Sequence, residues 1–100
     1  MNEDLEHLIP AIATVQVDNE RVRATRYHFA PGSETGWHKH GYDYVVVPTL
    51  AGTLTIVELD GSRREVAYQV GESYGRVLGA EHNVVNLSDS PVEFVEIELK

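Results

Sequence analysis

The sequence predicts an all-β fold in a single domain, and three observations carry that prediction. Short segments rich in β-branched and aromatic residues recur at intervals of about 8 to 12 residues and are bounded by Gly, Asp, Ser or Pro. No stretch sustains the apolar period of a helix. One hundred residues, 42% of them hydrophobic, suffice for one core and leave no room for a second domain. Residues 1–100 are therefore expected to form one small sandwich or barrel.

Each predicted strand follows from its local composition. Residues 11–17 and 21–29 flank Asp18 and Asn19 as a hairpin, and the turn-rich run 30–37 ends the second strand. A further strand is expected to begin at the run 38–40. The remaining strands are expected at 43–47, 53–59, 64–68, 73–78, 82–87 and 91–99. Between the second and third of these, Asp60 and Gly61 favour a tight type I′ turn. Only residues 3–8 could form a short helical turn.

Charge and composition restrict the partners. Sixteen acidic against eight basic residues give a formal net charge of −8, which disfavours nucleic acid and anionic membrane surfaces and favours a small-molecule partner. The sequence has no cysteine, which excludes disulfides, thiolate catalysis and cysteine-ligated metal centres. The first residues lack the basic and apolar run of a secretory signal, and no stretch approaches the about 20 apolar residues of a membrane span. A cytoplasmic protein is the resulting expectation.

Three histidines are spaced as ligands of one metal ion. His38 and His40 alternate along a strand, so their side chains project from the same face, about 6.6 Å apart along the chain. Two imidazoles at that separation can converge on one ion at about 2.0 to 2.1 Å each. His82 stands much later in a run of spaced glycines. Histidine suits iron, nickel, copper, zinc and to some degree manganese, so the pattern predicts a divalent metal without choosing its identity.

Both histidine segments resemble the paired motifs of the cupin superfamily. The first motif, Gly-x5-His-x-His-x3or4-Glu-x6-Gly, is matched at Gly32, His38 and His40, and Gly52 lies near the expected closing glycine. The second, Gly-x5-Pro-x-Gly-x2-His-x3-Asn, is followed across 71–86, with Val77 in place of the proline. The resemblance implies a single-domain antiparallel β-barrel of the jelly-roll type that holds one metal, and a homodimer, since cupins commonly pair through edge strands. Asn86, the last motif position, is expected to satisfy backbone groups in a turn.

The cupin pattern is broken where its glutamate ligand should fall. Four and five residues after His40 stand Tyr44 and Val45, and Asp43 is one residue early. By strand alternation Asp43 should face away from the histidines, so it could replace the glutamate only through a bulge. Tyr44 is the other candidate, as a distant ligand, as a catalytic group or as a hydrogen-bond donor to substrate, although a strand tyrosine is more often a packing residue. Three neutral imidazoles would leave the ion's charge uncompensated and keep about two or three positions open for ligand.

Two charged side chains are candidates for substrate binding beside Tyr44. Arg76 lies one loop before His82 and could form a bidentate contact with a substrate carboxylate. A surface charge is the alternative for Arg76, as it is for Arg23 and Arg26. Glu96 is predicted to lie on a solvated acidic face of the last strand, with an interior carboxylate as the alternative.

Two classes of function remain after these exclusions. Some cupin thiol and diketone dioxygenases are similar in using three histidines, which implies a metal-dependent enzyme of oxidoreductase type acting on a small organic acid or metabolite. The alternative is a non-catalytic cupin that binds a small ligand or metal as a sensor or accessory protein, because one barrel hosts many functions. The runs 43–48 and 94–99 resemble β-alanine degradation cupins, which implies a role beside β-alanine catabolism.

Overall fold

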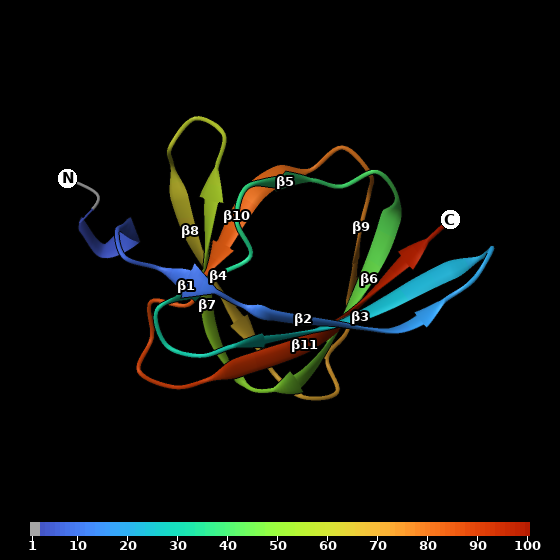
Figure 1. Ribbon diagram of the computed structural model, residues 1–100, viewed down its shortest axis with the longest axis horizontal. Helices are drawn as coiled ribbons and strands as arrows, with labels where there is room; N and C mark the ends of the chain where they lie inside the picture. The colour runs from blue at the N-terminus through green and yellow to red at the C-terminus, as the bar shows by residue number, and fades with distance from the viewer. Residues whose placement is uncertain (1–2) are drawn as a thin grey trace.

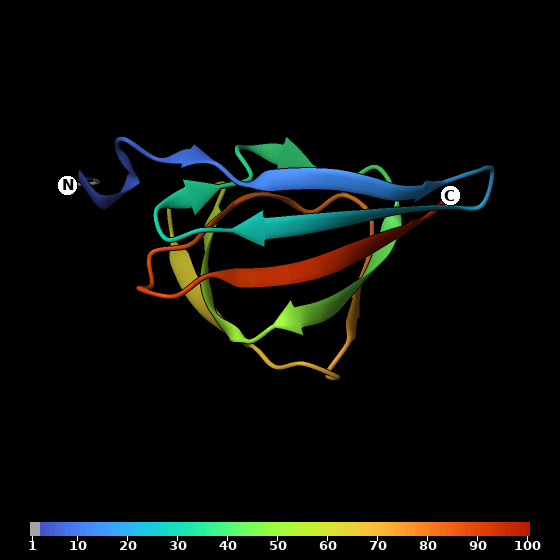
Figure 2. The ribbon, with the colours of Figure 1, turned by 60° about the horizontal axis from the view of Figure 1, so that its bottom comes forward.

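Residues 3–100 are described by a computed structural model, and they form two β-sheets that face each other around a shared interior (Figures 1 and 2). Apart from one 3-10 turn, η1 (Glu3–Leu5), the regular structure of the described chain is strand, which confirms the all-β prediction. None of its helical structure has the length and apolarity needed to cross a membrane.

The described residues form eleven strands, which divide between the two sheets. The first sheet has the order β1-β4-β10-β7-β8, with β5 also paired to β10. Its strands are β1 (Ile9–Pro10), β4 (Ser33–Glu34), β5 (His38–Lys39), β7 (Gly52–Glu58), β8 (Arg63–Tyr68) and β10 (Glu81–Val85). The second sheet has the order β2-β3-β11-β6-β9. Its strands are β2 (Ile12–Asp18), β3 (Val22–Phe29), β6 (Asp43–Leu50), β9 (Tyr74–Arg76) and β11 (Val92–Leu99).

Pairing between the strands is antiparallel except at β1 and β4. These two-residue strands pair in parallel, and the backbone N–H of Ile9 donates to the Gly32 carbonyl at 3.0 Å. The sequence analysis placed β4 in the turn-rich run 30–37, which is wrong, and it assigned no structure to residues 9–10. Two residues are too few to show a period of alternation, so only contacts between distant parts of the chain reveal these strands.

The two predicted hairpins, β2–β3 and β7–β8, are confirmed. The type I′ turn at Asp60 and Gly61 is wrong, because that turn needs a positive φ at both central residues and only Gly61 has one, at 86°. Instead, the loop is longer, with the Gly61 N–H donating to the Glu58 carbonyl at 3.0 Å. Asp60 Oδ1 accepts from the backbone N–H of Ser62 at 2.9 Å, an arrangement that stabilises the wider turn.

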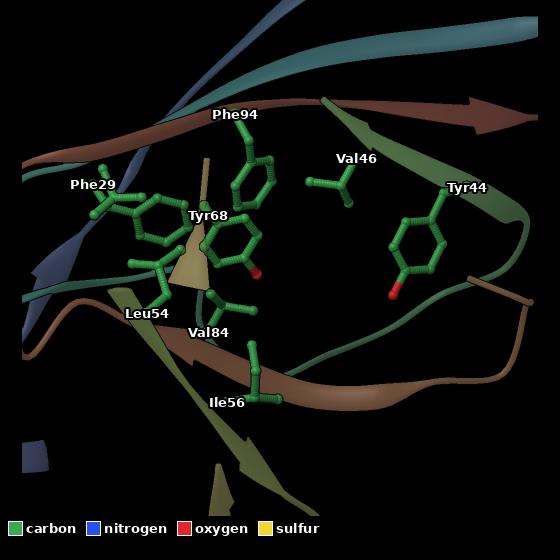
Figure 3. Packing of buried hydrophobic residues seen from close by; sticks show 9 residues of the cluster. Phe29, Tyr44, Val46, Leu54, Ile56, Tyr68, Val84 and Phe94 are labelled. Carbon is green, nitrogen blue, oxygen red and sulfur yellow. The ribbon is translucent and has the colours of Figure 1, made fainter. Parts of the chain in front are cut away.

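Aromatic and aliphatic side chains fill one end of the interior. Figure 3 shows Phe29 and Leu54 at that end and Tyr44 at the other, with Phe94 between them. The rings of Phe29 and Phe94 lie 5.5 Å apart, a separation at which aromatic pairs attract. Gly52, at the end of the first motif, lies against the side chain of Val92. A Cβ at this position would be 2.5 Å from Cγ2 of Val92. Close packing of the sheets at this end leaves the opposite end for polar groups.

Candidate metal centre

Strand pairing brings the three histidines together. His38 on β5 lies directly opposite His82 on β10 in the antiparallel register. Beyond β5 the backbone continues the pairing, since the His40 N–H donates to the Ala80 carbonyl and the Gly79 N–H donates to the His40 carbonyl, both at 2.8 Å. Gly79 has a φ of 96°, a left-handed conformation that favours glycine. The second motif thus turns the chain so that His82 faces the first pair.

The Nε2 atoms of the three rings converge. His38 Nε2 lies 3.1 Å from His40 Nε2, which lies 3.2 Å from His82 Nε2. Ligands that sit about 2.0 to 2.1 Å from one ion are about 3.0 Å apart at right angles and about 3.4 Å apart at tetrahedral angles. These two separations fall between these values, and the ligand nitrogens of all three histidines lie within 4.8 Å of one another. The donor set therefore fits one ion held from one side by three imidazoles.

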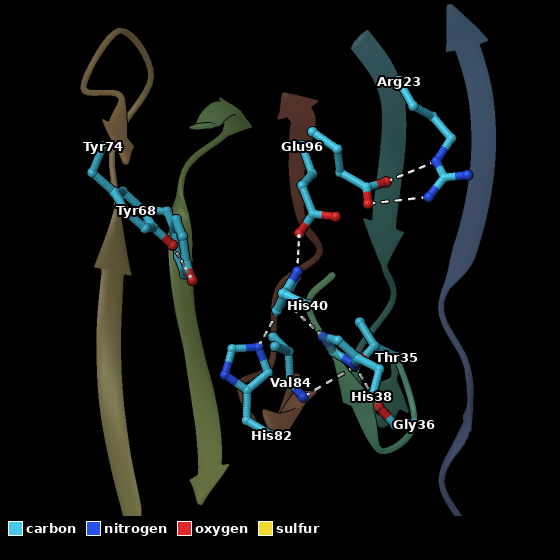
Figure 4. A network of polar contacts seen from close by, with 11 residues as sticks. Arg23, Thr35, Gly36, His38, His40, Tyr68, Tyr74, His82, Val84 and Glu96 are labelled. Carbon is cyan, nitrogen blue, oxygen red and sulfur yellow. Dashed lines mark hydrogen bonds and ion pairs between the residues drawn. The ribbon is translucent and has the colours of Figure 1, made fainter. Parts of the chain in front are cut away.

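Contacts behind His38 fix which of its nitrogens is available. His38 Nδ1 lies 2.9 Å from the Gly36 carbonyl oxygen, which can only accept, so Nδ1 carries the hydrogen and Nε2 keeps its lone pair (Figure 4). Asn83 Oδ1 in turn accepts from the Gly36 N–H at 3.0 Å, and the Thr35 hydroxyl lies 3.2 Å from His38 Nδ1. This network orients the His38 ring as a metal ligand.

Burial keeps the other two imidazoles neutral. It lowers the pKa of His40 to about 4, with smaller contributions from the neighbouring His38 and His82 rings. Burial, followed by the effect of His38, also lowers the pKa of His82 to about 4. Neutral imidazole is the form that binds metal, so both rings are in the ligating state at neutral pH.

Glu96 points into the interior, which corrects the prediction of a solvated face. Its side chain is buried, and Oε1 lies 3.9 Å from His40 Nδ1, on the side of the ring away from the other histidines (Figure 4). Burial is the largest cause that raises the pKa of Glu96 to about 7, and the nearby Glu98 carboxylate makes a smaller contribution in the same direction. The solvated interpretation failed because β11 turns this face inward, where Phe94 packs in the core.

Tyr44 and Asp43 occupy the positions around the missing glutamate. The Tyr44 ring stacks on the His40 ring, with centroids 3.9 Å apart and planes 17° apart, and its burial raises its pKa to about 12. Asp43 is exposed, and its Oδ1 accepts from the Leu78 N–H at 2.9 Å. Among the described His, Asp and Glu side chains, the cluster able to share an ion consists of His38, His40 and His82. Asp43 therefore faces away from the cluster, as strand alternation predicts.

Comparison with known proteins identifies the family of the chain. The profile of the cupin domain matches residues 25–98. The chain belongs to the cupin family. It is 51% identical over 90 residues to the β-alanine degradation protein BauB of Pseudomonas aeruginosa, covering 90% of this chain and 94% of that protein.

Solved structures place the cupin among close and distant relatives. The crystal structure of a cupin domain from Bordetella pertussis Tohama I is 50% identical, has a TM-score of 0.88 and covers 93% of this chain and 96% of that one. An RmlC-like cupin with a double-stranded β-helix fold from Methanocaldococcus jannaschii has a TM-score of 0.74 at 14% identity, with 94% and 84% covered. The second similarity concerns the fold alone, and both support the jelly-roll prediction.

Two of the three arginines considered in the sequence analysis form ion pairs with glutamates, and the third lines the cavity. Arg23 forms two hydrogen bonds with Glu98, at 2.8 and 3.1 Å, and Arg26 pairs with Glu93, so both have the structural role that the sequence analysis gave as their alternative. Arg76 lines the same cavity as the histidines. Its guanidinium lies over the ring of Tyr74, on its own strand, 4.5 Å from the centroid.

A cavity of about 40 Å³ adjoins the histidines. Its lining contains the three predicted metal ligands and the three substrate-binding candidates of the sequence analysis, together with polar groups that the sequence analysis did not name. The lining includes the candidates His38, His40, Tyr44, Arg76, His82 and Glu96. The missed polar residues are Tyr27, Thr35, Arg64, Tyr68 and Tyr74. Alternation along 64–68 places Arg64 and Tyr68 on one face, but it does not say which face is internal.

Asn86 has the role expected of it. The side chain is fully buried, and its Nδ2 donates to the carbonyls of Phe29 and Ser90 at 3.0 and 2.9 Å. Its Oδ1 accepts from the backbone N–H of Ser88 at 3.0 Å. The last residue of the second motif therefore holds the turn between β10 and β11 and does not contact the metal centre.

Proposed function

We propose that His38, His40 and His82 hold one divalent cation and that the cupin is a metal-dependent enzyme acting on a small organic acid or related metabolite. The observation that carries this proposal is the convergence of three Nε2 atoms, 3.1 and 3.2 Å apart, beside a cavity. The donor set suits iron, nickel, zinc, manganese or copper and does not choose among them.

The side chains around the cation divide the work of such a site. A cation held by three protein ligands keeps coordination positions open and, when bound, acts as a Lewis acid on a substrate oxygen. Glu96, beside His40, would offset part of the charge that three neutral ligands leave uncompensated. Tyr44 covers one face of the His40 ring and keeps water from it. Arg76 would receive a substrate carboxylate.

The small organic acid is proposed to belong to β-alanine catabolism. The relative BauB carries that role in its name, and the similarity spans nearly all of both chains. The volume of the cavity, about 40 Å³, agrees with a small organic acid as substrate. Neither observation supplies the reaction.

A turnover screen tests the enzyme proposal. Metal-loaded protein is incubated with three- and four-carbon carboxylic acids while oxygen consumption and product formation are followed, with His82→Ala as the inactive control. Turnover of at least one acid by the native protein, lost in the variant, is expected. Binding of the acids without turnover of any of them would contradict the enzyme and favour the non-catalytic sensor or accessory protein.

We also propose that the cupin forms a homodimer through β2. This strand lies at the edge of its sheet (Figure 2), and all seven of its residues are exposed, among them Ile12, Val15 and Val17. The strand has one charged residue, Asp18 at its end, and an exposed edge of this length is a template for pairing with another strand. Light scattering coupled to gel filtration should give a dimer mass, and Val15→Lys should give a monomer. A monomeric native protein would contradict the proposal.

A further inference from the structure

Two tyrosines link the edges of the two sheets inside the cavity. Tyr68 ends β8, the edge strand of the first sheet, and Tyr74 begins β9, the edge strand of the second. The Tyr74 hydroxyl donates to the Tyr68 hydroxyl at 3.0 Å (Figure 4). We call these two residues the tyrosine pair. Both line the cavity that holds the three histidines.

Only one of the two hydroxyl hydrogens of the tyrosine pair is used in the hydrogen bond between them. A phenol has one hydrogen to donate, and that of Tyr74 is given to Tyr68. Within residues 3–100, nothing accepts the hydrogen of Tyr68, although its side chain is 4% exposed and Figure 3 shows its hydroxyl directed into the interior. Tyr44 is also 4% exposed, and no described residue accepts its hydrogen either. Two buried phenols therefore aim unused donors into one cavity, and such donors favour a ligand that accepts.

A cation without a carboxylate partner completes this part of the lining. In the described chain, the only hydrogen bond of Arg76 goes from its Nη1 to the Gly75 carbonyl at 2.9 Å, and its guanidinium lies over the Tyr74 ring. Arg64 differs, since its Nε donates to Glu58 Oε1 at 2.8 Å. Arg76 is exposed and lies where the cavity meets solvent. The wall therefore combines neutral donors inside with a positive charge at the mouth.

The size of the cavity limits what can bind there. Its volume of about 40 Å³ is small beside the about 300 to 1,000 Å³ of pockets for drug-sized ligands. A ligand that spans from the histidines to the tyrosine pair can therefore have only a few non-hydrogen atoms inside. Its two ends meet different chemistry, because one faces the cation proposed above and the other faces hydrogen-bond donors.

We propose that the tyrosine pair and Arg76 bind the carboxylate of a three- or four-carbon acid. The third carbon of this acid carries a further oxygen, outside the carboxylate, which reaches the metal and is called its second oxygen below. The substrate class is then a 3-hydroxy or 3-oxo carboxylate. This inference rests on the proposed metal centre, which supplies the binding partner of the second oxygen. Tyr68 contacts the carboxylate directly, whereas Tyr74 acts by holding the Tyr68 hydroxyl through its hydrogen bond.

Calorimetric titration of the metal-loaded protein with 3-hydroxypropionate tests the assignment. Tyr68→Phe should weaken binding about tenfold, as expected for one lost hydrogen bond to a charged group, and Tyr74→Phe should weaken it less. Tyr42→Phe is the matched control, because Tyr42 is a phenol outside the cavity lining, and it should leave the dissociation constant unchanged. Unchanged binding in Tyr68→Phe, with full metal content and a native circular dichroism spectrum, would overturn the assignment.

Two further titrations separate this inference from the metal centre. Propionate, which lacks the second oxygen, should bind more weakly than 3-hydroxypropionate to the loaded protein and equally to the metal-free protein. Equal affinities in the loaded protein would overturn the contact between the second oxygen and the metal. If the native protein takes up no metal, the proposed function fails, and loss of 3-hydroxypropionate binding in Tyr68→Phe would then still support the carboxylate subsite. No binding of either acid to native protein would overturn that subsite.

Discussion

The two faces of strand β11 treat a glutamate in opposite ways. On the outer face, Glu93 accepts hydrogen bonds from Arg26 Nε at 2.8 Å and from the Thr49 hydroxyl at 2.7 Å, and His28 Nδ1 lies 3.0 Å away. The bond from Arg26 is the largest cause that lowers the pKa of Glu93 to about 2. On the inner face, Glu96 has no such donor among the described residues, and burial raises its pKa to about 7.

This difference separates a carboxylate that stabilises the fold from one that destabilises it. A lowered pKa means that ionised Glu93 is favoured in the folded protein, whereas a raised pKa means that folding opposes the ionisation of Glu96. A buried carboxylate that opposes folding and lies 3.9 Å from a candidate ligand is typical of a functional site. The outer face of β11 therefore serves stability, and the inner face serves the site.

The largest expected effect is a gain of stability in metal-free Glu96→Gln. The unfolded chain ionises Glu96 above about pH 4.5, but the folded protein does so only above about pH 7, so the penalty grows between these values and is full above them. The substitution should stabilise the protein by up to about 3 kcal/mol near pH 8 and by little near pH 4. Urea unfolding at both pH values measures it.

Metal loading sharpens this prediction. A divalent cation near Glu96 favours the ionised carboxylate, so the gain from Glu96→Gln should shrink once the protein is loaded. A variant less stable than the native protein at pH 8 without metal would break the contrast between the two faces.

An effect of similar size for each ring, with the opposite dependence on pH, is expected from the buried histidines, seen best in the metal-free Glu96→Gln background. His40 and His82 stay neutral in the folded protein down to about pH 4, while the unfolded chain protonates them below about pH 6.5. Stability should therefore fall by up to about 3 kcal/mol for each ring as the pH drops between these values. His82→Ala in the same background should reduce this dependence. A flat profile would show that the two rings are not held neutral.

The smallest effect is expected at the outer face, where Glu93→Gln should destabilise the protein by about 1 kcal/mol at neutral pH. Its carboxylate is ionised in both states at that pH, and only the folded state gains the contacts with Arg26 and His28. The effect should shrink as the pH falls below about 4.5 and vanish below about 2, where Glu93 is protonated in both states. Urea unfolding at the two pH values measures it. Stabilisation by this substitution would contradict the assignment of Glu93 as a stabilising group.

The sequence was sufficient to predict the histidine cluster but not its surroundings. Local features of the sequence predict the cluster, namely the spacing of His38 and His40 and the glycines before His82, and the three side chains do lie together in the fold. Strand alternation also predicts that Asp43 faces away from them, as observed. Alternation gives each strand two faces, and the choice of the inner one depends on which strands pair. Glu96 was therefore assigned to solvent when its face packs inward.

The tyrosine pair shows a second limit of the same kind. Tyr68 and Tyr74 are six residues apart, yet they sit on the edges of different sheets, and their contact exists only because the two edges meet. No local pattern encodes that closure. The parallel pairing of β1 with β4 was missed for the related reason that two-residue strands have no period.

Elemental analysis of protein purified without added metal tests the central claim most directly. The three-histidine centre predicts about one equivalent of a divalent metal per chain in the native protein. Lys39→Ala should hold the same amount, because the Lys39 side chain is exposed although it lies between His38 and His40 in the sequence. His82→Ala should lose most of the metal while its circular dichroism spectrum stays that of a folded β protein. Stoichiometric metal retained in folded His82→Ala would contradict the three-histidine assignment.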